Sequence, residues 1–456
     1  MMDLDQLLEL DNDDPVLKPL PKKRKKVIGL DDLLTDFYKE EGKLVEKAAR
    51  KARAAARQRD DSDEEDDDRE ASLCQFVDTC ENKINGIGGK DDIFLWGICV
   101  FGDQKSPPPV AFPELESCTI LQSFMNNKLN SEFEICTDNG DTLLEGLLVN
   151  GWLSKVVFAR SHVEKSVAMW TFNLMVYSSN EDLRTSACDF WCAILSSKNQ
   201  VKIDWLPSYS ELKLALKNYG FLFNSSNTEY VHSNSARPGP AQNIRALIKY
   251  VTTSCQVRIK TAIYLTSEAE ELIEIITYLF LDRQLQGLFV LLNECMQSAI
   301  SYFTDDEWES SCEKIAKSLA RRIPKDVNCL RIVECISGAN YHSKMLRSVV
   351  AYQILHSCFD FKARDEVELL NLLISINVKK DCDFFMLYVY LVLAENWLLS
   401  DQLGDEKQVL NEMWRLYLQN CSCLIASTDL RSFASKVRNK ASYLLQGTIT
   451  NEISSN

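Results

Sequence analysis

The sequence predicts an all-α protein: an elongated, irregular stack of antiparallel helices of the HEAT or armadillo type, preceded by a disordered N-terminal tail. Three observations support this prediction. Apolar residues recur at intervals of three and four through most of the chain beyond residue 141. Ser or Thr precedes Glu by three residues at several places where such a row begins, as in a helix capping box. Strand-like alternation of apolar and polar residues is almost absent.

Three helices of similar length are expected between residues 141 and 196, the first of them with two short apolar rows. Their apolar rows occupy 143–148, 153–157, 167–175 and 183–194. Ser161 and Glu164 have the spacing of a capping box ahead of the third row, and Asn180 is a candidate N-cap for the fourth. Short joints between helices of similar length indicate a stack in which neighbours cover one another.

The second half of the chain shows the same pattern more strongly. Ser267 with Glu270, and Thr304 with Glu307, have capping-box spacing and are predicted to begin two helices. The helix after Thr304 should end before Pro324, which cannot continue it. Further helices are expected at 327–336, 346–358, 365–376, 381–399, 405–424 and 428–446.

Five regions follow from these patterns. A disordered charged tail is expected at 1–72, an N-terminal helical region at 73–223, a polar linker at 224–241, a C-terminal helical region at 242–447 and a disordered end at 448–456. The linker prediction rests on the Pro238-Gly239-Pro240 run that closes it. Pro107, Pro108 and Pro109 indicate an extended crossing of the surface within the N-terminal region.

Composition limits the chemistry that the chain can perform. The net charge is −15 and 46% of the residues are hydrophobic, and both the tail and the remainder are net acidic, which disfavours a large DNA-clamping surface. The 16 cysteines form no C-x-x-C pair, and the 4 histidines have no metal-ligand spacing, so buried free thiols are expected, without metal or cofactor. The longest apolar run ends before Glu395 and is too short to span a bilayer. A soluble protein of a reducing compartment is expected.

A compact basic cluster lies in the tail next to a proline. It consists of Lys22, Lys23, Arg24, Lys25 and Lys26. Such a cluster suits the acidic groove of a nuclear import receptor, so it predicts a nuclear localisation signal. The alternative is a solvated charge run that binds anions without specificity.

An amphipathic segment follows at 30–44. It presents Leu30, Leu33, Leu34, Phe37 and Tyr38 at helical spacing within a polar tail. A helix of this kind, with no core of its own nearby, is expected to dock in the groove of a partner protein. Packing back onto the chain's own fold is the alternative.

Opposite charges lie side by side in the rest of the tail. Residues 43–59 form a basic, strongly helix-forming segment, and residues 60–68 form an acidic block that includes Ser62, a candidate phosphorylation site. The acidic block competes with nucleic acid for the basic helix at high effective concentration. Direct DNA binding is therefore expected to be weak.

The chain also carries a series of short strings in a characteristic order. They are LDRQL at 281–285, TDDEW at 304–308, RIP at 322–324, NCLRIVE at 328–334 and SKVRNKA at 435–441, the last ahead of YLLQ at 443–446. In content and order they resemble the CANIN domain of the Nse-six-like subunits, which localise the SMC five/six chromosome-maintenance complex. The resemblance covers up to about the last two-thirds of the chain. It implies a nucleus-located, non-enzymatic scaffold whose partners are an Nse-five-like helical subunit and the SMC five/six complex.

No catalytic motif of a hydrolase, kinase, metalloprotease or nucleotide-binding protein occurs. His342 and His356 are interpreted as capping or core residues, and Trp308 and Trp397 as core residues. The preferred reading is therefore a protein that is not an enzyme and that serves DNA repair and chromosome maintenance. Two alternatives stay open: a helical adaptor in transcription regulation, and an enzyme whose site is assembled from distant residues. A pocket lined by converging polar groups would favour the enzyme.

Overall fold

The computed structural model describes residues 96–113, 118–119, 122, 140–197, 201–223, 241–258, 262–378, 382–398, 408–429 and 431–454. The predicted tail at 1–72 lies outside these residues, as does nearly all of the predicted linker at 224–241. All of the described helices belong to one compact unit, residues 87–456.

The described residues fold into 15 α-helices and one short 3₁₀ helix. The first eight are α4 (Gly140–Val149), α5 (Trp152–Arg160), α6 (Lys165–Tyr177), α7 (Glu181–Ser196), α8 (Tyr209–Asn218), α9 (Ile244–Gln256), α10 (Thr266–Leu281) and α11 (Phe289–Ile300), with the 3₁₀ helix η4 (Arg283–Leu288) before α11. The others are α12 (Asp305–Arg322), α13 (Asn328–Cys335), α14 (Tyr341–Cys358), α15 (Glu366–Ile374), α16 (Phe384–Leu398), α17 (Gln408–Cys423) and α18 (Ala434–Ser454). The prediction of an all-α stack is confirmed.

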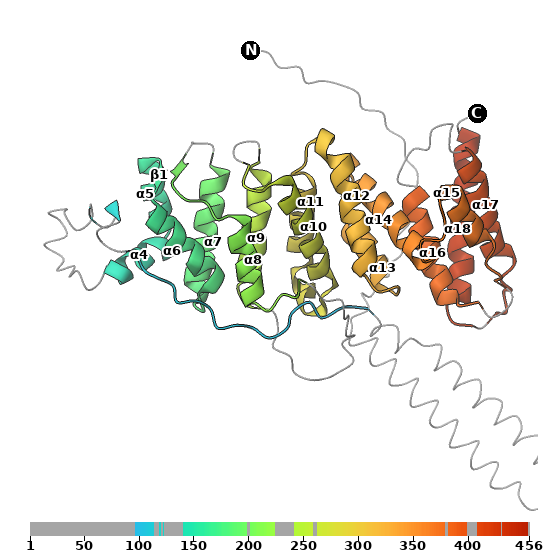
Figure 1. Ribbon diagram of the computed structural model, residues 1–456, viewed down its shortest axis with the longest axis horizontal. Coiled ribbons are helices and arrows are strands. Elements are labelled where there is room, and N and C mark those ends of the chain that lie inside the picture. The colour runs from blue at the N-terminus through green and yellow to red at the C-terminus, as the bar shows by residue number, and fades with distance from the viewer. Residues whose placement is uncertain are drawn as a thin grey trace, which may run out of the picture. The chain divides into compact units, whose positions relative to one another are not determined.

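Each helix buries its apolar face against helices close to it in sequence (Figure 1). The succession of packed neighbours runs α6, α7, α9, α11, α10, α12, α14, α16, α18 and α17. Smaller helices fill the sides: α4 and α5 pack on α7, α13 packs on α10 and α16, and α15 packs on α17. The core does not break at the predicted linker, because α9 packs directly on α6 and α7.

Helix α12 shows how the sequence determines an element of this stack. The carboxylate of Glu307 accepts hydrogen bonds from the backbone N–H and the hydroxyl of Thr304, so the predicted helix start is confirmed. Arg321 and Arg322 occupy the last turn, where the helix dipole favours cations. The apolar row between these ends is buried: Trp308, Cys312, Ile315, Ala316 and Leu319. This face packs against α14 and α10.

Two other predicted capping boxes are wrong. Helix α10 begins at Thr266, and Glu268 accepts the backbone N–H of Leu265 at 2.8 Å; Glu270 instead accepts the hydroxyl of Ser311 at 2.7 Å. Ser161 adopts a left-handed conformation at the end of α5 and does not cap α6. In both places a tertiary contact displaces the local signal. The predicted Asn180 cap is confirmed by its bonds to the next turn of α7.

The last helix also differs from its prediction. It begins at Ala434 rather than after Thr428, and the residue before it, Phe433, has a left-handed φ of 64°. At its other end α18 runs to Ser454, beyond residue 447, where the sequence analysis placed the end of the helical region. Three further helices, α8, α9 and α11, lie where the sequence analysis named none.

An extended segment, residues 96–113, runs along the ends of several helices in the direction opposite to their order in the chain (Figure 1). Three backbone N–H groups of this segment donate hydrogen bonds to the helices. Gly97 donates to the side chain of Asn328 (2.7 Å), Ile98 to the carbonyl of Leu281 (3.0 Å) and Val100 to the carboxylate of Asp282 (3.3 Å). Farther along, it pairs with residues that follow α8. We call this segment the strap. The predicted surface crossing thus joins α13, α10 and α8.

The described strands are very short. β1 (His162–Val163) and β2 (Lys202–Ile203) form a parallel pair, with His162 opposite Lys202 and Val163 opposite Ile203. The Nε2 of His162 lies 2.8 Å from the carboxylate of Asp204, just after β2. This pair therefore ties the start of α6 to the segment that follows α7, without forming a sheet of any size.

Candidate docking groove

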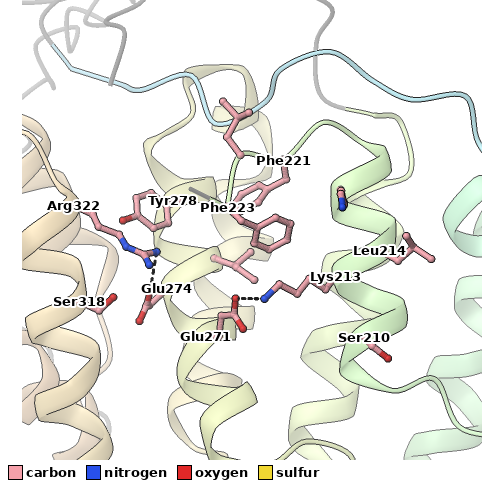
Figure 2. Close-up of a pocket in the computed structure, with 13 residues that line it drawn as sticks. Ser210, Lys213, Leu214, Phe221, Phe223, Glu271, Glu274, Tyr278, Ser318 and Arg322 are labelled. Carbon is pink, nitrogen blue, oxygen red and sulfur yellow. Dashed lines mark hydrogen bonds and ion pairs between the residues drawn. The ribbon is translucent and has the colours of Figure 1, made fainter. Parts of the chain in front are cut away.

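An open groove of about 930 Å³ lies among α8, α10, α12 and the residues that follow α8 (Figure 2). Its lining combines aromatic and aliphatic side chains with charged ones. The lining residues are Ser210, Lys213, Leu214, Lys217, Phe221, Leu222, Phe223, Glu271, Glu274, Ile275, Tyr278, Ser318 and Arg322. They come from three segments of the chain, 210–223, 271–278 and 318–322, which are about 40 to 50 residues apart, so only the folded stack brings them together.

Aromatic rings form one wall of the groove. Phe221 and Phe223 meet edge to face with ring centroids 4.9 Å apart, and the Nζ of Lys213 lies 5.1 Å above the ring of Phe223. The strap holds this wall in place, because Phe221 forms a β-bridge and a second edge-to-face contact, at 5.8 Å, with Phe101. Phe221 is accordingly buried, with 5% of its surface exposed.

A glycine, Gly220, directly precedes the aromatic wall in the chain. Gly220 has a φ of +86°, a left-handed conformation that favours glycine, and its carbonyl accepts the N–H of Gly102 at 2.8 Å. A Cβ at this position would lie 2.6 Å from the carbonyl oxygen of Gly102. The close approach of the strap to the turn after α8 therefore depends on the absence of a side chain.

Two ion pairs cross between the helices that flank the groove (Figure 2). The Nζ of Lys213 on α8 lies 2.6 Å from the Oε1 of Glu271 on α10. The Nη1 of Arg322 on α12 lies 3.4 Å from the Oε2 of Glu274, also on α10. The carboxylates of α10 therefore pair with a cation from each neighbouring helix.

The environment of the groove also shifts two pKa values. Burial raises the pKa of Glu274, while the Ser318 hydroxyl and the Arg322 guanidinium act in the opposite direction. Burial likewise raises the pKa of Tyr278 to about 12, so the phenol stays protonated at neutral pH. The lining contains no His or Cys.

Apolar groups and one cation remain available at the rim. The side chains of Leu214 and Leu222 are 52% and 42% exposed. Lys217 points from the last turn of α8 and forms no ion pair with the residues that the structure describes. An open groove with exposed leucines, an aromatic wall and a free cation suits contact with apolar side chains that carry a carboxylate nearby.

The groove is formed by residues that the sequence analysis did not single out as sites. The predicted localisation signal at 22–26 and the predicted docking residues Leu30, Leu33, Leu34, Phe37 and Tyr38 lie outside the described residues. The groove itself was missed. One local signal was available: Ser208 and Glu211 have capping-box spacing, and the Ser208 N–H does bond the Glu211 carboxylate at the start of α8.

The histidines singled out from the sequence take part in local contacts. His342 stacks on the buried Trp308 and its Nε2 lies 2.9 Å from the Asp305 carboxylate. His356 contacts the carbonyl of Ala363 at 2.8 Å and stacks on Tyr352. The contacts of His342 join α14 to α12, whereas those of His356 lie within α14 and the turn that follows it.

No group of three or more His, Cys, Asp or Glu side chains within the described ranges is arranged to hold a metal ion. No single described helix is long and apolar enough to cross a membrane; two bent pairs, Thr142–Val149 with Trp152–Arg160 and Thr266–Leu281 with Arg283–Ile300, reach the required length and composition only when their halves are combined.

Comparison with known proteins gives no further assignment. No protein-family model matches the chain, and no curated protein matches it. The fold and the groove define an all-helical protein whose helices pack neighbour on neighbour, and functional inference rests on these features and on the sequence.

Proposed function

We propose that the protein is a non-enzymatic nuclear scaffold that helps to bring the SMC five/six complex to chromatin in DNA repair and chromosome maintenance. The proposal starts from the resemblance of its short strings to the CANIN domain. In the structure LDRQL turns from α10 into η4, TDDEW begins α12, and NCLRIVE forms most of α13.

One observation carries the choice of a binding role over a catalytic one. The charged groups of α10 in the groove, Glu271 and Glu274, are each paired with a cation from a neighbouring helix, whereas Leu214 and Leu222 are left exposed. An active site commonly holds converging polar groups that are poised to react. In this groove the carboxylates of α10 are paired with cations while the two leucines are exposed, which favours protein contact.

The proposed occupant is an amphipathic helix of a partner subunit, in keeping with an Nse-five-like helical protein. Its apolar residues would cover Leu214, Leu222 and the aromatic wall, and a carboxylate on the helix would meet Lys217. Charge complementarity supports this choice, because Lys217 is the groove cation that has no described carboxylate partner. The tail adds a second proposed contact through the helix at 30–44, and the cluster at 22–26 directs nuclear entry. DNA contact is weak in this proposal.

The function is tested by removing the protein from cells and measuring how much of the SMC five/six complex stays with chromatin after DNA damage. We expect a loss of the chromatin-bound fraction with no change in the total amount, restored by the wild-type chain. Restoration should fail when all five cations at 22–26 are replaced by alanine, unless an unrelated localisation signal is added. An unchanged chromatin fraction would favour the transcription adaptor.

A further inference from the structure

A second, smaller pocket lies among the end of α10, the start of α11 and α13, beside the first residue of the strap. We call it the strap pocket. Its lining includes Trp96, Phe280, Leu285, Phe289 and Leu292. Its volume is about 270 Å³, which is below the roughly 300–1,000 Å³ of small-molecule sites. The strap pocket therefore has the size for one large side chain.

The strap pocket leaves aromatic surface uncovered. Phe289 is 50% exposed, although its ring meets Phe280 edge to face with ring centroids 5.6 Å apart. Leu285 and Leu292, by contrast, are 2% and 1% exposed. An exposed aromatic ring beside a buried apolar lining suits a further apolar side chain.

The described part of the chain begins at this pocket, with Trp96. Gly97 fixes the position of Trp96, because a Cβ at Gly97 would lie 2.6 Å from the side chain of Arg283. An apolar run at 93–95, with Phe94 at its centre, directly precedes Trp96. Successive side chains of an extended chain point to opposite faces, so Phe94 shares the face of Trp96 in an extended chain. Its Cα then lies within about 7 Å of the Trp96 Cα.

The side chain of Asn328, at the start of α13, has an unmet hydrogen-bond donor in the same corner. Asn328 is fully buried, and its Oδ1 accepts the N–H of Gly97 at 2.7 Å. Its Nδ2 has no hydrogen-bond partner among the described residues, whereas buried amide donors are nearly always bonded. The backbone that precedes Trp96 enters the structure here and carries carbonyl acceptors. The unmet donor therefore points to a further length of chain at this corner.

Two cations lie against Trp96. The guanidinium carbons of Arg331 and Arg283 are 4.2 Å and 5.7 Å from the centroid of its ring. Asp91 and Asp92 come directly before the apolar run at 93–95. Their carboxylates are within reach of this corner, since an extended chain advances about 3.3–3.6 Å per residue. This charge complementarity favours the chain's own segment over an apolar peptide that lacks carboxylates.

We propose that residues 91–95 bind back onto the stack and that the ring of Phe94 fills the strap pocket against Phe289. The two aspartates then lie beside Arg331, and a backbone carbonyl of the segment accepts the amide of Asn328. In this arrangement Phe94 anchors the beginning of the strap and belongs to the chain's own fold. The inference does not depend on the proposed scaffold function.

The direct test replaces Phe94 of the full-length chain by benzoylphenylalanine, a photoactivated analogue, and maps the cross-links by mass spectrometry after irradiation. Cross-links within one chain to residues 280–292 and 331–335 are expected. The same replacement at Phe76 is the control and should give no such links. Links from position 94 to other parts of the stack would overturn the proposal. Links between two chains would make a second copy the occupant and would overturn it as well.

A double-mutant cycle measures the same contact without an enlarged side chain. Phe94→Ala should lower the melting temperature by about 2 °C or more. This shift should be smaller when Phe289→Ala has already removed the facing ring, because the effects of residues in contact are not additive. Val290→Ala is the matched control: Val290 is 80% exposed, follows Phe289 in the chain and does not line the pocket, so the shift should be unchanged. Equal shifts in all three backgrounds, or none, would overturn the proposal and leave the pocket to a partner protein.

Discussion

Glu307 accepts a hydrogen bond from the guanidinium of Arg258 at 2.9 Å, which connects the start of α12 to the segment that follows α9. The same carboxylate accepts the hydroxyl of Thr266 at 3.1 Å and the backbone N–H of Thr304 at 3.0 Å. The bonds from Thr304, and then those from Arg258 and Thr266, lower the pKa of Glu307 to about 2. One helix-capping residue thus joins three helices of the stack.

This arrangement predicts a pH-dependent contribution to stability. Because the folded pKa of Glu307 is depressed, its ionised form stabilises the fold above the unfolded pKa of about 4.3, and the contribution is lost as the pH falls toward 2. Glu307→Gln should lower the free energy of unfolding by about 1 kcal/mol at pH 7, allowing for partial solvent screening. The difference from wild type should shrink as the pH falls from 5 to 3, measured by urea unfolding.

The matched control is Glu313→Gln in the same helix. Glu313 pairs only with Lys317 on the surface, four residues farther along, so its loss should cost about 0.3–0.5 kcal/mol. Equal losses for the two variants at pH 7 would mean that the contacts of Glu307 with Arg258 and Thr266 add nothing to the fold.

The close approach of the strap to the turn after α8 gives a second prediction. Gly220→Ala should destabilise the protein by more than the roughly 1–2 kcal/mol that a left-handed alanine costs, because its Cβ would also meet the Gly102 carbonyl. Gly151→Ala is the control: its φ is +70°, but no atom lies within 4 Å of the added Cβ. Thermal unfolding of the two variants should differ clearly. Equal melting temperatures would show that the strap moves away at no cost.

The groove is tested by a charged substitution at its rim. Leu214→Glu should weaken binding of the helical partner by about tenfold or more, since it replaces an apolar contact and sets a carboxylate against the incoming one. Leu416→Glu, on α17, is the control, because Leu416 is 46% exposed and lies outside the groove. Binding should be measured with purified proteins, and the molar mass of the chain alone should be checked. If the chain alone forms a dimer and Leu214→Glu abolishes it, the occupant of the groove is a second copy of the chain.

The amphipathic segment of the tail gives a fourth prediction. Leu33→Ala combined with Phe37→Ala should weaken a partner complex by roughly a hundredfold or more, because each buried anchor contributes about 1.5–3 kcal/mol. The melting temperature of the isolated protein should stay the same. A melting temperature several degrees lower with unchanged partner binding would show that this segment packs on the chain's own fold.

The described helices with clear caps and apolar rows could be predicted from the sequence, and the groove could not. The start of α12 follows from Thr304 and Glu307, which bond within one turn, so the signal is local. The start of α10 was misplaced because Glu268, and not Glu270, closes the capping box, while Glu270 accepts the Ser311 hydroxyl of the neighbouring helix. The ion pair of Lys213 with Glu271 joins residues 58 positions apart. No pattern of residues close together in the sequence predicts such a contact, because it forms only when the helices are stacked.

The central claim, that the protein is a scaffold for the SMC five/six complex, is tested most directly by affinity purification of the tagged chain from nuclear extract, with partner amounts measured by quantitative mass spectrometry. The account predicts near-stoichiometric recovery of a helical partner subunit together with the SMC five/six subunits, and a reduced recovery with Leu214→Glu but not with Leu416→Glu. Recovery of a stoichiometric partner set that lacks every SMC five/six subunit would contradict it.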